Sequence, residues 1–278
     1  MEKKKKSTKL KRVISGVVLF PMVLVLFVFA NNLIMDILLA AISIISCYEY
    51  AKCFKTGGKA NPSKWYMYLV STLLIGTTFM SNLALREIMI AVLPISILIL
   101  MIELILSKDK KNFNDVATTL IGILYIPMMM VFMAFIRNRF VNGKVIVWFI
   151  FIAAWGSDIF AYLIGSRFGK HKFTKISPNK SIEGCVAGIV GATLIAIIYT
   201  IVINNIMNLG INVGYVTIIT MILALVGQIG DLAASSIKRY CGIKDFSELI
   251  PGHGGMLDRI DSVIFMLPFA YILLGLLL

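Results

Sequence analysis

Long apolar runs alternate with short polar segments along the whole chain. A membrane-spanning helix needs about 20 mostly apolar residues, and stretches of about that length recur from one end of the sequence to the other. The pattern predicts an all-α polytopic integral membrane protein with about nine transmembrane helices. We expect these helices at 13–30, 32–50, 65–82, 87–106, 116–136, 146–165, 184–205, 212–230 and 262–278.

The first two runs and the fifth carry additional signals. A basic start followed by the apolar run 13–30 is also the pattern of a signal peptide. No small-residue cleavage site precedes the next apolar segment, so we expect a retained first helix. The short junction at Asn31 and Asn32 favours a helical hairpin. Pro127 is predicted to kink the helix at 116–136, because proline leaves a carbonyl without its intrahelical donor.

Composition supports the membrane interpretation. Hydrophobic residues make up 59% of the 278 residues and charged residues 15%, whereas a soluble domain carries about 45–50% and about 25%. This excess excludes an ordinary cytosolic enzyme, a disordered chain and a secreted disulfide scaffold. The four cysteines have no C-x-x-C spacing and there are two histidines, which argues against a zinc site.

The net charge of +13 is most informative when each Lys and Arg is assigned to the inner or the outer side of the membrane. With the N-terminus inside, the inner segments 1–12, 51–64, 107–115, 166–183 and 231–261 contain nearly all Lys and Arg, which predicts a cytoplasmic N-terminus and an outer C-terminus. The cluster from Arg137 to Lys144 is an exception. Either the rule fails locally, or a helix within 116–165 is half-buried or re-entrant.

This assignment divides the chain into three parts. We expect a basic cytoplasmic N-terminus at 1–12, N-terminal transmembrane helices over 13–145, and a catalytic transmembrane region over 146–278 with cytoplasmic loops at 166–183 and 231–261. Without a basic soluble domain the charge does not predict nucleic-acid binding.

The first of these loops is rich in groups that bind phosphate. Asp158 lies within an apolar helix, where an ionisable side chain is costly and usually marks a site or a charge partner. The segment Ser177-Pro178-Asn179-Lys180-Ser181 reads as a rigid turn that presents an amide, a hydroxyl and an ammonium group together, a set that suits oxyanions. A basic loop that serves topology alone is the alternative.

The second loop combines carboxylates with cations. Asp231 ends one predicted helix, and Asp258 and Asp261 lie one turn apart at the start of the next, so a helix there places both on one face. Mg²⁺ prefers a few carboxylates, waters and substrate phosphates, which predicts a magnesium site. Aspartate–arginine pairs that only satisfy each other are the alternative.

Cations and a glycine-rich turn accompany these carboxylates. Pro251-Gly252-His253-Gly254-Gly255 lets the backbone approach a ligand closely, and we favour a phosphate hydrogen bond over a general-base role for His253. Positive charge for phosphates comes from Lys238, Arg239, Lys244 and Arg259. In contrast, Asp36, Glu49 and Glu103 are expected to be interhelical or interfacial partners.

The second loop resembles the signature of the phosphatidate cytidylyltransferase (CDP-diacylglycerol synthase) family. The similarity covers 27 positions without a gap, from Ser235-x-Ile-Lys-Arg through Lys244-Asp245 to His253-Gly-Gly-x-x-Asp-Arg-x-Asp261. The first loop is similar to the family's other cluster, from Asp158 to Glu183-Gly184. It departs at Ile159, where a serine or threonine is expected, and at Ser166, where a cation is common.

The resemblance implies a Mg²⁺-dependent nucleotidyltransferase of phospholipid biosynthesis, which joins CTP and phosphatidic acid into CDP-diacylglycerol and pyrophosphate. It implies metal binding by Asp231, Asp258 and Asp261, with a second metal ion, monovalent or divalent, beside Mg²⁺. The catalytic residues it implies are Asp231, Lys238, Arg239, Lys244, Asp245, His253, Asp258, Arg259 and Asp261. The substrate-binding residues it implies are Asp158, Ser177, Asn179, Lys180, Ser181, Glu183, Ser235, Gly254 and Gly255.

The expected partners are CTP, phosphatidic acid and the lipid bilayer, with a homodimer as an open alternative. We expect a multi-pass protein of the cell membrane with its active site on the cytoplasmic side. A CTP-dependent polyprenol kinase, with similar loops, would release CDP in place of pyrophosphate. A secondary transporter could use Asp36, Asp158 and Asp231 as an ion path, but the inverted repeats typical of that class are not visible in the sequence.

Overall fold

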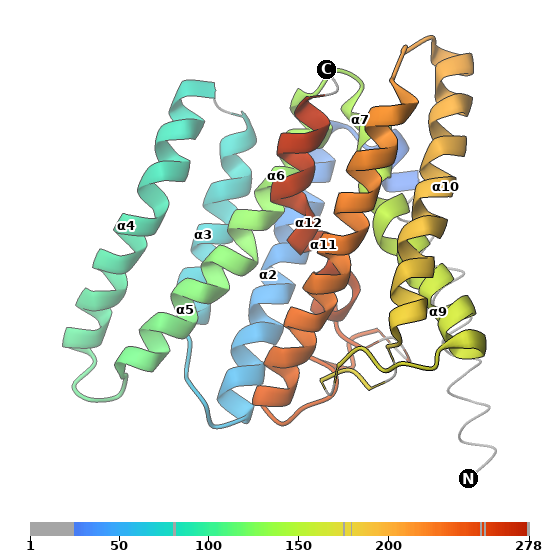
Figure 1. Cartoon of the computed structure of the whole chain (residues 1–278). Helices are drawn as coiled ribbons and strands as arrows, with labels where there is room; N and C mark the ends of the chain where they lie inside the picture. The colour runs from blue at the N-terminus through green and yellow to red at the C-terminus, as the bar shows by residue number, and fades with distance from the viewer. Residues whose placement is uncertain are drawn as a thin grey trace. The chain divides into compact units, whose positions relative to one another are not determined.

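The described residues of the computed structural model are helical apart from loops and two isolated β-bridges, which confirms the all-α fold class. The structure describes residues 25–79, 82–174, 176–178, 180–250, 252 and 254–276. Its longer helices are α2 (Asn32–Thr56), α3 (Lys64–Gly76), α4 (Asn82–Leu106), α5 (Phe113–Tyr125), α6 (Pro127–Arg139), α9 (Ser157–Phe168), α10 (Ile182–Met207), α11 (Val213–Tyr240) and α12 (Leu257–Gly275) (Figure 1).

Six helical segments among the described residues are long and apolar enough to cross a membrane. They are Asn32–Thr56, Glu87–Leu106, Phe113–Arg139, Gly143–Phe168, Ile182–Met207 and Val213–Tyr240, and each overlaps one of the predicted spans. The described part of the chain is therefore all-helical and has the character of a membrane protein.

The other three predicted spans have different outcomes. Most of 13–30 lies outside the described residues. The described part of the run 65–82 lies in the 13-residue α3, a short 3₁₀ turn at Thr77–Phe79 and the first residue of α4. The Thr77 and Thr78 hydroxyls donate to the Leu74 and Ile75 carbonyls at the end of α3. The run 262–278 belongs to α12, which begins earlier, at Leu257, and so includes charged residues at its start.

Pro127 was predicted to kink its helix, and in the structure one helix ends and another begins at this point. Helix α5 starts with a capping box between Asn112 and Asp115 and ends at Tyr125, and α6 starts at Pro127 itself. Between them Ile126 departs from helical geometry, with φ −104° and ψ −77°. Proline is tolerated at a first helical position, where no intrahelical donor is needed. Near the end of α6, the buried Arg137 donates to Asn138 Oδ1 at 3.2 Å.

The segment Gly143–Phe168 is irregular. It consists of the single turns α7 (Gly143–Ile146) and α8 (Trp148–Phe151), a π-helical turn at Ile152–Gly156, and α9. A π turn inserts an extra residue into a helix and is frequent at functional sites. Here it directly precedes Ser157, the first residue of α9, and Asp158 lies in the first turn of that helix.

The described residues form two compact units. One contains the described part of Met1–Ala134 together with Lys238–Ile260, and the other contains Phe135–Ile237 together with Asp261–Leu278. Within the first, α2, α3, α4 and α5 are neighbours (Figure 1). Ser43 Oγ of α2 donates to Ser71 Oγ of α3 at 3.0 Å, and Tyr50 donates to the Thr118 carbonyl of α5 at 3.2 Å.

In the second unit, glycines let α9 and α10 pack closely. A Cβ added to Gly184 would lie 2.9 Å from the Ala161 carbonyl oxygen and 3.1 Å from the Cα of Gly165. Only glycine fits such an approach of two backbones. The close packing brings the loop between the two helices, 169–181, to their common end.

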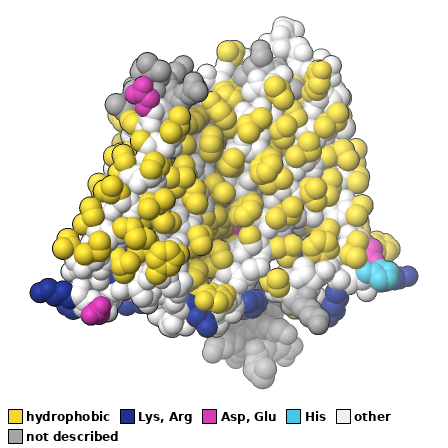
Figure 2. Space-filling view, turned by 60° about the vertical axis from the view of Figure 1, so that its left-hand side comes forward, with side chains coloured by type: hydrophobic (Ala, Val, Ile, Leu, Met, Phe, Trp, Pro, Cys, Tyr) yellow, Lys and Arg dark blue, Asp and Glu magenta, His cyan; other side chains and the backbone are white. Residues whose placement is uncertain are grey.

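Exposed apolar side chains follow the long helices, including Leu98 and Ile102 on α4 and Leu194 and Ile198 on α10. In Figure 2 hydrophobic side chains cover the lengths of the helices in view, while Lys and Arg side chains lie near helix ends. Apolar faces along helices suit lipid, and cations near helix ends suit the headgroup region.

Candidate functional site

The second loop is built around one buried ion pair. Lys238, in the last turn of α11, places its Nζ 2.6 Å from Asp258 Oδ1, in the first turn of α12. Both residues are buried. Asp258 Oδ2 accepts the backbone N–H groups of Phe246 and Gly255, each at 2.9 Å. The carboxylate thus connects two helix ends with the loop between them.

The glycine-rich turn depends on its glycines for two different reasons. Gly254 has a φ of +83°, and a Cβ there would lie 3.0 Å from Asp258 Oδ2. Gly255 would place a Cβ 2.6 Å from the carboxylate of Glu49. The Ile250 N–H donates to the Gly254 carbonyl at 2.9 Å and closes the turn. This turn therefore needs glycine both for its backbone conformation and for space.

Glu49, from α2, supports the same turn from the N-terminal half of the chain. Its buried carboxylate accepts the N–H groups of Met256 at 2.9 Å and Leu257 at 2.7 Å, and the Ser247 hydroxyl donates to it at 2.5 Å. The first N–H groups of a helix have no intrahelical acceptor, and a carboxylate there is also favoured by the helix dipole. Glu49 therefore caps the helix that carries Asp258.

The remaining residues of the predicted set differ in exposure. Arg239, Lys244, Asp245 and Arg259 are exposed, while Ser235 and Asp261 are buried. Arg239 Nη1 donates to the Ile243 carbonyl at 3.0 Å, and Asp261 Oδ1 accepts the Ser262 N–H at 2.7 Å. The exposed cations are accessible to phosphates, but His253 lies outside the described residues.

The first loop holds a second lysine–aspartate pair. Lys180 Nζ lies 2.5 Å from Asp231 Oδ2 on α11, and both side chains are partly exposed. The Phe173 N–H donates to the Lys180 carbonyl at 2.9 Å, and the Lys180 N–H donates to the Ser177 carbonyl at 3.1 Å. The turn that carries Lys180 is thus closed by backbone hydrogen bonds, as the Ser-Pro-Asn-Lys-Ser sequence predicted.

Ser181 and Glu183 anchor this turn to α10. The Ser181 hydroxyl caps the helix by accepting the Gly184 N–H at 3.1 Å. The Glu183 carboxylate accepts the N–H groups of Lys170 and His171 at 3.2 Å and lies 2.6 Å from His171 Nδ1. Ser181 and Glu183 therefore position the loop. The Ser181 hydroxyl and the Glu183 carboxylate both make hydrogen bonds within the protein for this purpose.

A hollow of about 540 Å³ lies beside the turn, lined by Lys172, Phe173, Thr174 and Pro178. Ser177 lies next to this lining, and Asn179 lies outside the described residues. Asp158 is exposed in the first turn of α9. The hollow combines a cation, a hydroxyl and an aromatic ring, which are groups that suit a nucleotide.

The donor chemistry of the predicted metal ligands fits Mg²⁺. Within the described part of the chain, no three His, Cys, Asp or Glu side chains form a cluster that could hold a metal by themselves. Mg²⁺ requires only one or two carboxylates when substrate phosphates supply the rest. The two aspartates differ in how far they are engaged: Asp258 accepts Lys238 at Oδ1 and two backbone N–H groups at Oδ2 and is buried, whereas the partly exposed Asp231 is paired with Lys180 through Oδ2 and keeps Oδ1 as the more accessible ligand atom.

Two residues that position these loops, Glu49 and His171, were not among the predicted catalytic or substrate-binding residues. Glu49 was expected to be an interhelical or interfacial partner, and it is one. Its partners are the N–H groups of Met256 and Leu257, which directly follow the glycine-rich turn 251–255, the signature turn. His171, adjacent to the predicted turn, pairs with Glu183. A glutamate near the end of an otherwise apolar helix is the sequence signal for Glu49, although the sequence does not identify its partners.

Comparison with known proteins relates nearly the whole chain to one family. A model of the cytidylyltransferase family matches residues 10–277. A phosphatidate cytidylyltransferase of Bacillus subtilis strain 168 is 32% identical over 269 residues, which are 96% of this chain and 97% of the relative. Phosphatidate cytidylyltransferases of Staphylococcus epidermidis RP62A and Staphylococcus aureus COL are each 40% identical over 171 residues, 61% of this chain and 63% of the relatives.

Proposed function

Since this chain belongs to the cytidylyltransferase family, we propose that it transfers the cytidylyl group of CTP to phosphatidic acid, giving CDP-diacylglycerol and pyrophosphate. The observation that carries the proposal is the family match along nearly the full length of the chain. The buried Lys238–Asp258 pair in the signature loop supports it, because that loop is built as a rigid, cation-bearing platform.

The reaction joins two anions. A phosphate oxygen of the lipid attacks the α-phosphorus of CTP, a new P–O bond forms, and the bond from the α-phosphorus to the bridging oxygen breaks as pyrophosphate leaves. Catalysis of such a transfer consists mainly of positioning and charge stabilisation. The exposed cations Arg239, Lys244 and Arg259 would offset the repulsion between the two phosphates.

The two lysine–aspartate pairs would divide this work. Lys180, on a turn closed by backbone hydrogen bonds, would bind the nucleotide phosphates or the leaving pyrophosphate. Ser177 and Asn179 are further candidates for contacts with the nucleotide. Lys238 is buried against Asp258 and Phe246. It would therefore fix the loop in place and add positive charge beneath the surface that the substrates contact. Asp245, Gly254 and Gly255 would shape the surface that meets the lipid headgroup.

Asp231, Asp258 and Asp261 are the candidate ligands of Mg²⁺ and of a second metal ion. When bound, Mg²⁺ would neutralise phosphate charge and favour the departure of pyrophosphate. The partly exposed carboxylate of Asp231, paired with Lys180 through Oδ2 only, supports this assignment. The lysines would hold these carboxylates in place as ligands.

For the membrane arrangement we propose nine spans, a cytoplasmic N-terminus and an active site on the cytoplasmic side of the cell membrane. The distribution of Lys and Arg supports this orientation. CTP is a cytoplasmic nucleotide, so both loops would meet it on that side, while the acyl chains of the lipid stay in the bilayer.

A purified-enzyme assay tests the reaction. The full chain, reconstituted with phosphatidic acid and CTP labelled on the α-phosphate, should convert label into CDP-diacylglycerol and release pyrophosphate when Mg²⁺ is present. Omitting Mg²⁺ should abolish turnover. Release of CDP in place of pyrophosphate would instead indicate a CTP-dependent kinase and overturn the proposal.

A further inference from the structure

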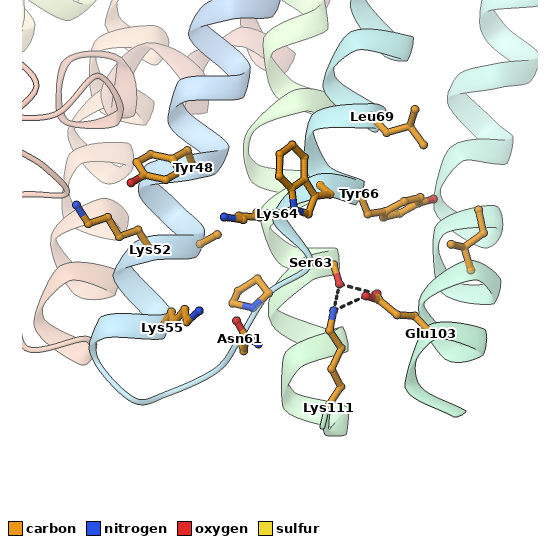
Figure 3. Close-up of a pocket in the computed structure, with 14 residues that line it drawn as sticks. Tyr48, Lys52, Lys55, Asn61, Ser63, Lys64, Tyr66, Leu69, Glu103 and Lys111 are labelled. Carbon is orange, nitrogen blue, oxygen red and sulfur yellow. Dashed lines mark hydrogen bonds and ion pairs between the residues drawn. The ribbon is translucent and has the colours of Figure 1, made fainter. Parts of the chain in front are cut away.

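The N-terminal helices contain a cavity that has no part in the proposed reaction. It has a volume of about 900 Å³ and lies within the first compact unit, where α2, α3 and α4 meet the loops 57–63 and 107–112. None of the residues lining it belongs to the two loops of the candidate functional site. Figure 3 shows its polar lining at the helix ends and Leu69 further along α3.

The cavity has an excess of positive charge. Four lysines and one glutamate line it. Lys111 Nζ lies 2.5 Å from Glu103, which uses up the one carboxylate of the lining. The other three, Lys52, Lys55 and Lys64, are absent from the ion pairs found among the described residues.

Hydrogen bonds hold the walls of this cavity in place. The Asn61 N–H donates to Asp115 Oδ1 at 2.5 Å, and the Ser63 N–H donates to Thr119 Oγ1 at 2.9 Å, so α5 fixes the loop between α2 and α3. Lys111 also donates to Ser63 Oγ. The Tyr66 hydroxyl, donating to Ser96 Oγ at 3.0 Å, ties α3 to α4.

The remaining lining is apolar and aromatic. Trp65 is 74% exposed, and Leu69 and Tyr48 are also exposed. Lys64 Nζ lies 5.5 Å from the centre of the Trp65 ring. Tryptophan, tyrosine and lysine at helix ends are typical of the level where lipid headgroups meet acyl chains. The cavity therefore offers cations to a headgroup and apolar surface to a chain.

We propose that this cavity binds an anionic phospholipid at a site separate from the catalytic one. The phosphate would lie among Lys52, Lys55 and Lys64, and an acyl chain would follow Leu69 and Ile99 along α3 and α4. Lysines at helix ends are enough to orient the chain in the membrane. A cavity with hydrogen-bonded walls, in which Glu103 neutralises Lys111, is not needed for that purpose. Walls held by hydrogen bonds, with three further lysines beside the Lys111–Glu103 pair, suit a bound headgroup phosphate.

Native mass spectrometry of the full chain in mild detergent tests the proposal. The chain is offered equal amounts of phosphatidylglycerol and phosphatidylcholine with the same acyl chains, and the ratio of retained lipids is measured. The wild-type chain should retain phosphatidylglycerol preferentially. Because a lysine near the membrane surface contributes about five-fold to anionic-lipid binding, the variant Lys55→Gln/Lys64→Gln should lower that preference on the order of ten-fold.

A matched variant controls for charge alone. Lys108→Gln/Lys110→Gln removes the same charge from exposed positions outside the cavity lining and should keep the wild-type preference. An equal loss in both variants, or no loss in either, would overturn the proposal. Thermal unfolding of each variant verifies that the fold is intact, and Trp65→Leu provides a variant that keeps the charge and should weaken retention.

Soluble anions form the second arm of the test. Inorganic phosphate and glycerol 3-phosphate are added as competitors at millimolar concentration. A lipid site should keep its phosphatidylglycerol, because the soluble anions lack the acyl chain. Displacement of the lipid by either competitor would show that the cavity binds a free phosphate, which contradicts a lipid site.

Discussion

The carboxylate of Glu49 accepts the backbone N–H of Leu257 at 2.7 Å, so a residue of α2 caps the helix that carries Asp258. Glu49→Gln replaces one acceptor oxygen by a donor that faces N–H groups. We expect the free energy of unfolding to fall by about 1–3 kcal/mol. We also expect kcat to fall on the order of ten-fold, with a smaller change in the KM for CTP, because the turn loses its fixed position.

Two further variants separate positioning from stability in that experiment. Glu49→Asp keeps the acceptor chemistry and should recover part of kcat. The exposed Glu248→Gln, in the same loop, should leave kcat unchanged. If Glu49→Gln lowers the amount of folded protein but not the kcat per folded molecule, Glu49 has only a structural role.

The pair formed by Lys238 and Asp258 should be required for both stability and activity. Asp258→Asn leaves the buried lysine without its counter-charge, and breaking a buried pair in this way costs about 3–5 kcal/mol. Adding Lys238→Met should recover stability but not activity. Stability and CDP-diacylglycerol formation are measured for the single variants and the double variant. Near-full activity of Asp258→Asn would refute its role as a metal ligand.

Lys180 should be required for the reaction but contribute little to folding. Its pair with Asp231 is partly exposed, and such pairs contribute about 0–1 kcal/mol. Lys180→Ala should raise the KM for CTP or lower kcat at least ten-fold while the melting temperature stays close to that of the wild type. The neighbouring exposed lysine provides the control, since Lys170→Ala should keep wild-type kinetics. Unchanged kinetics for Lys180→Ala would leave this loop with a topological role only.

The glycines of the signature turn should differ in their tolerance of alanine. Gly255→Ala would place a methyl group against the Glu49 carboxylate, and Gly254→Ala adds a strained φ to a close contact with Asp258. We expect both to reduce activity more than ten-fold. Gly242→Ala has a similar positive φ of +73° but open space around it. It should cost about 1 kcal/mol of stability and little activity. A loss of activity in Gly242→Ala as large as in Gly254→Ala would mean that the positive φ, and not the contact with Asp258, is what matters.

Cysteine labelling tests the orientation in the membrane. In a chain without its native cysteines, Thr174→Cys should resist an impermeant thiol reagent in intact cells and react after the cells are opened. Leu209→Cys, in the short loop between α10 and α11, should react in intact cells. The reverse pattern would invert the proposed topology and place the site on the outer side.

The sequence predicted most of this architecture, because apolar runs and proline act locally. The predicted span 65–82 continues past the end of α3, because hydropathy does not register the threonine hydroxyls that donate to the last carbonyls of that helix. The candidate site residues were predicted in the same way, from their spacing within two loops. Their partners were not: Glu49 and Leu257 are 208 positions apart, and no local pattern links them. The same holds for Lys180 and Asp231, which tertiary packing alone brings together.

The separation between Glu49 and its partners also sets the order of events during synthesis. The ribosome adds about 5–20 residues per second, so α2 exists for roughly 10–40 seconds before the turn that it holds has been made. During that interval its carboxylate faces water, lipid or another partner. The signature turn therefore forms late, when most of the chain has been synthesised and its C-terminal part can pack against α2. A chain terminated before residue 255 would lack the Met256 and Leu257 N–H groups that donate to Glu49.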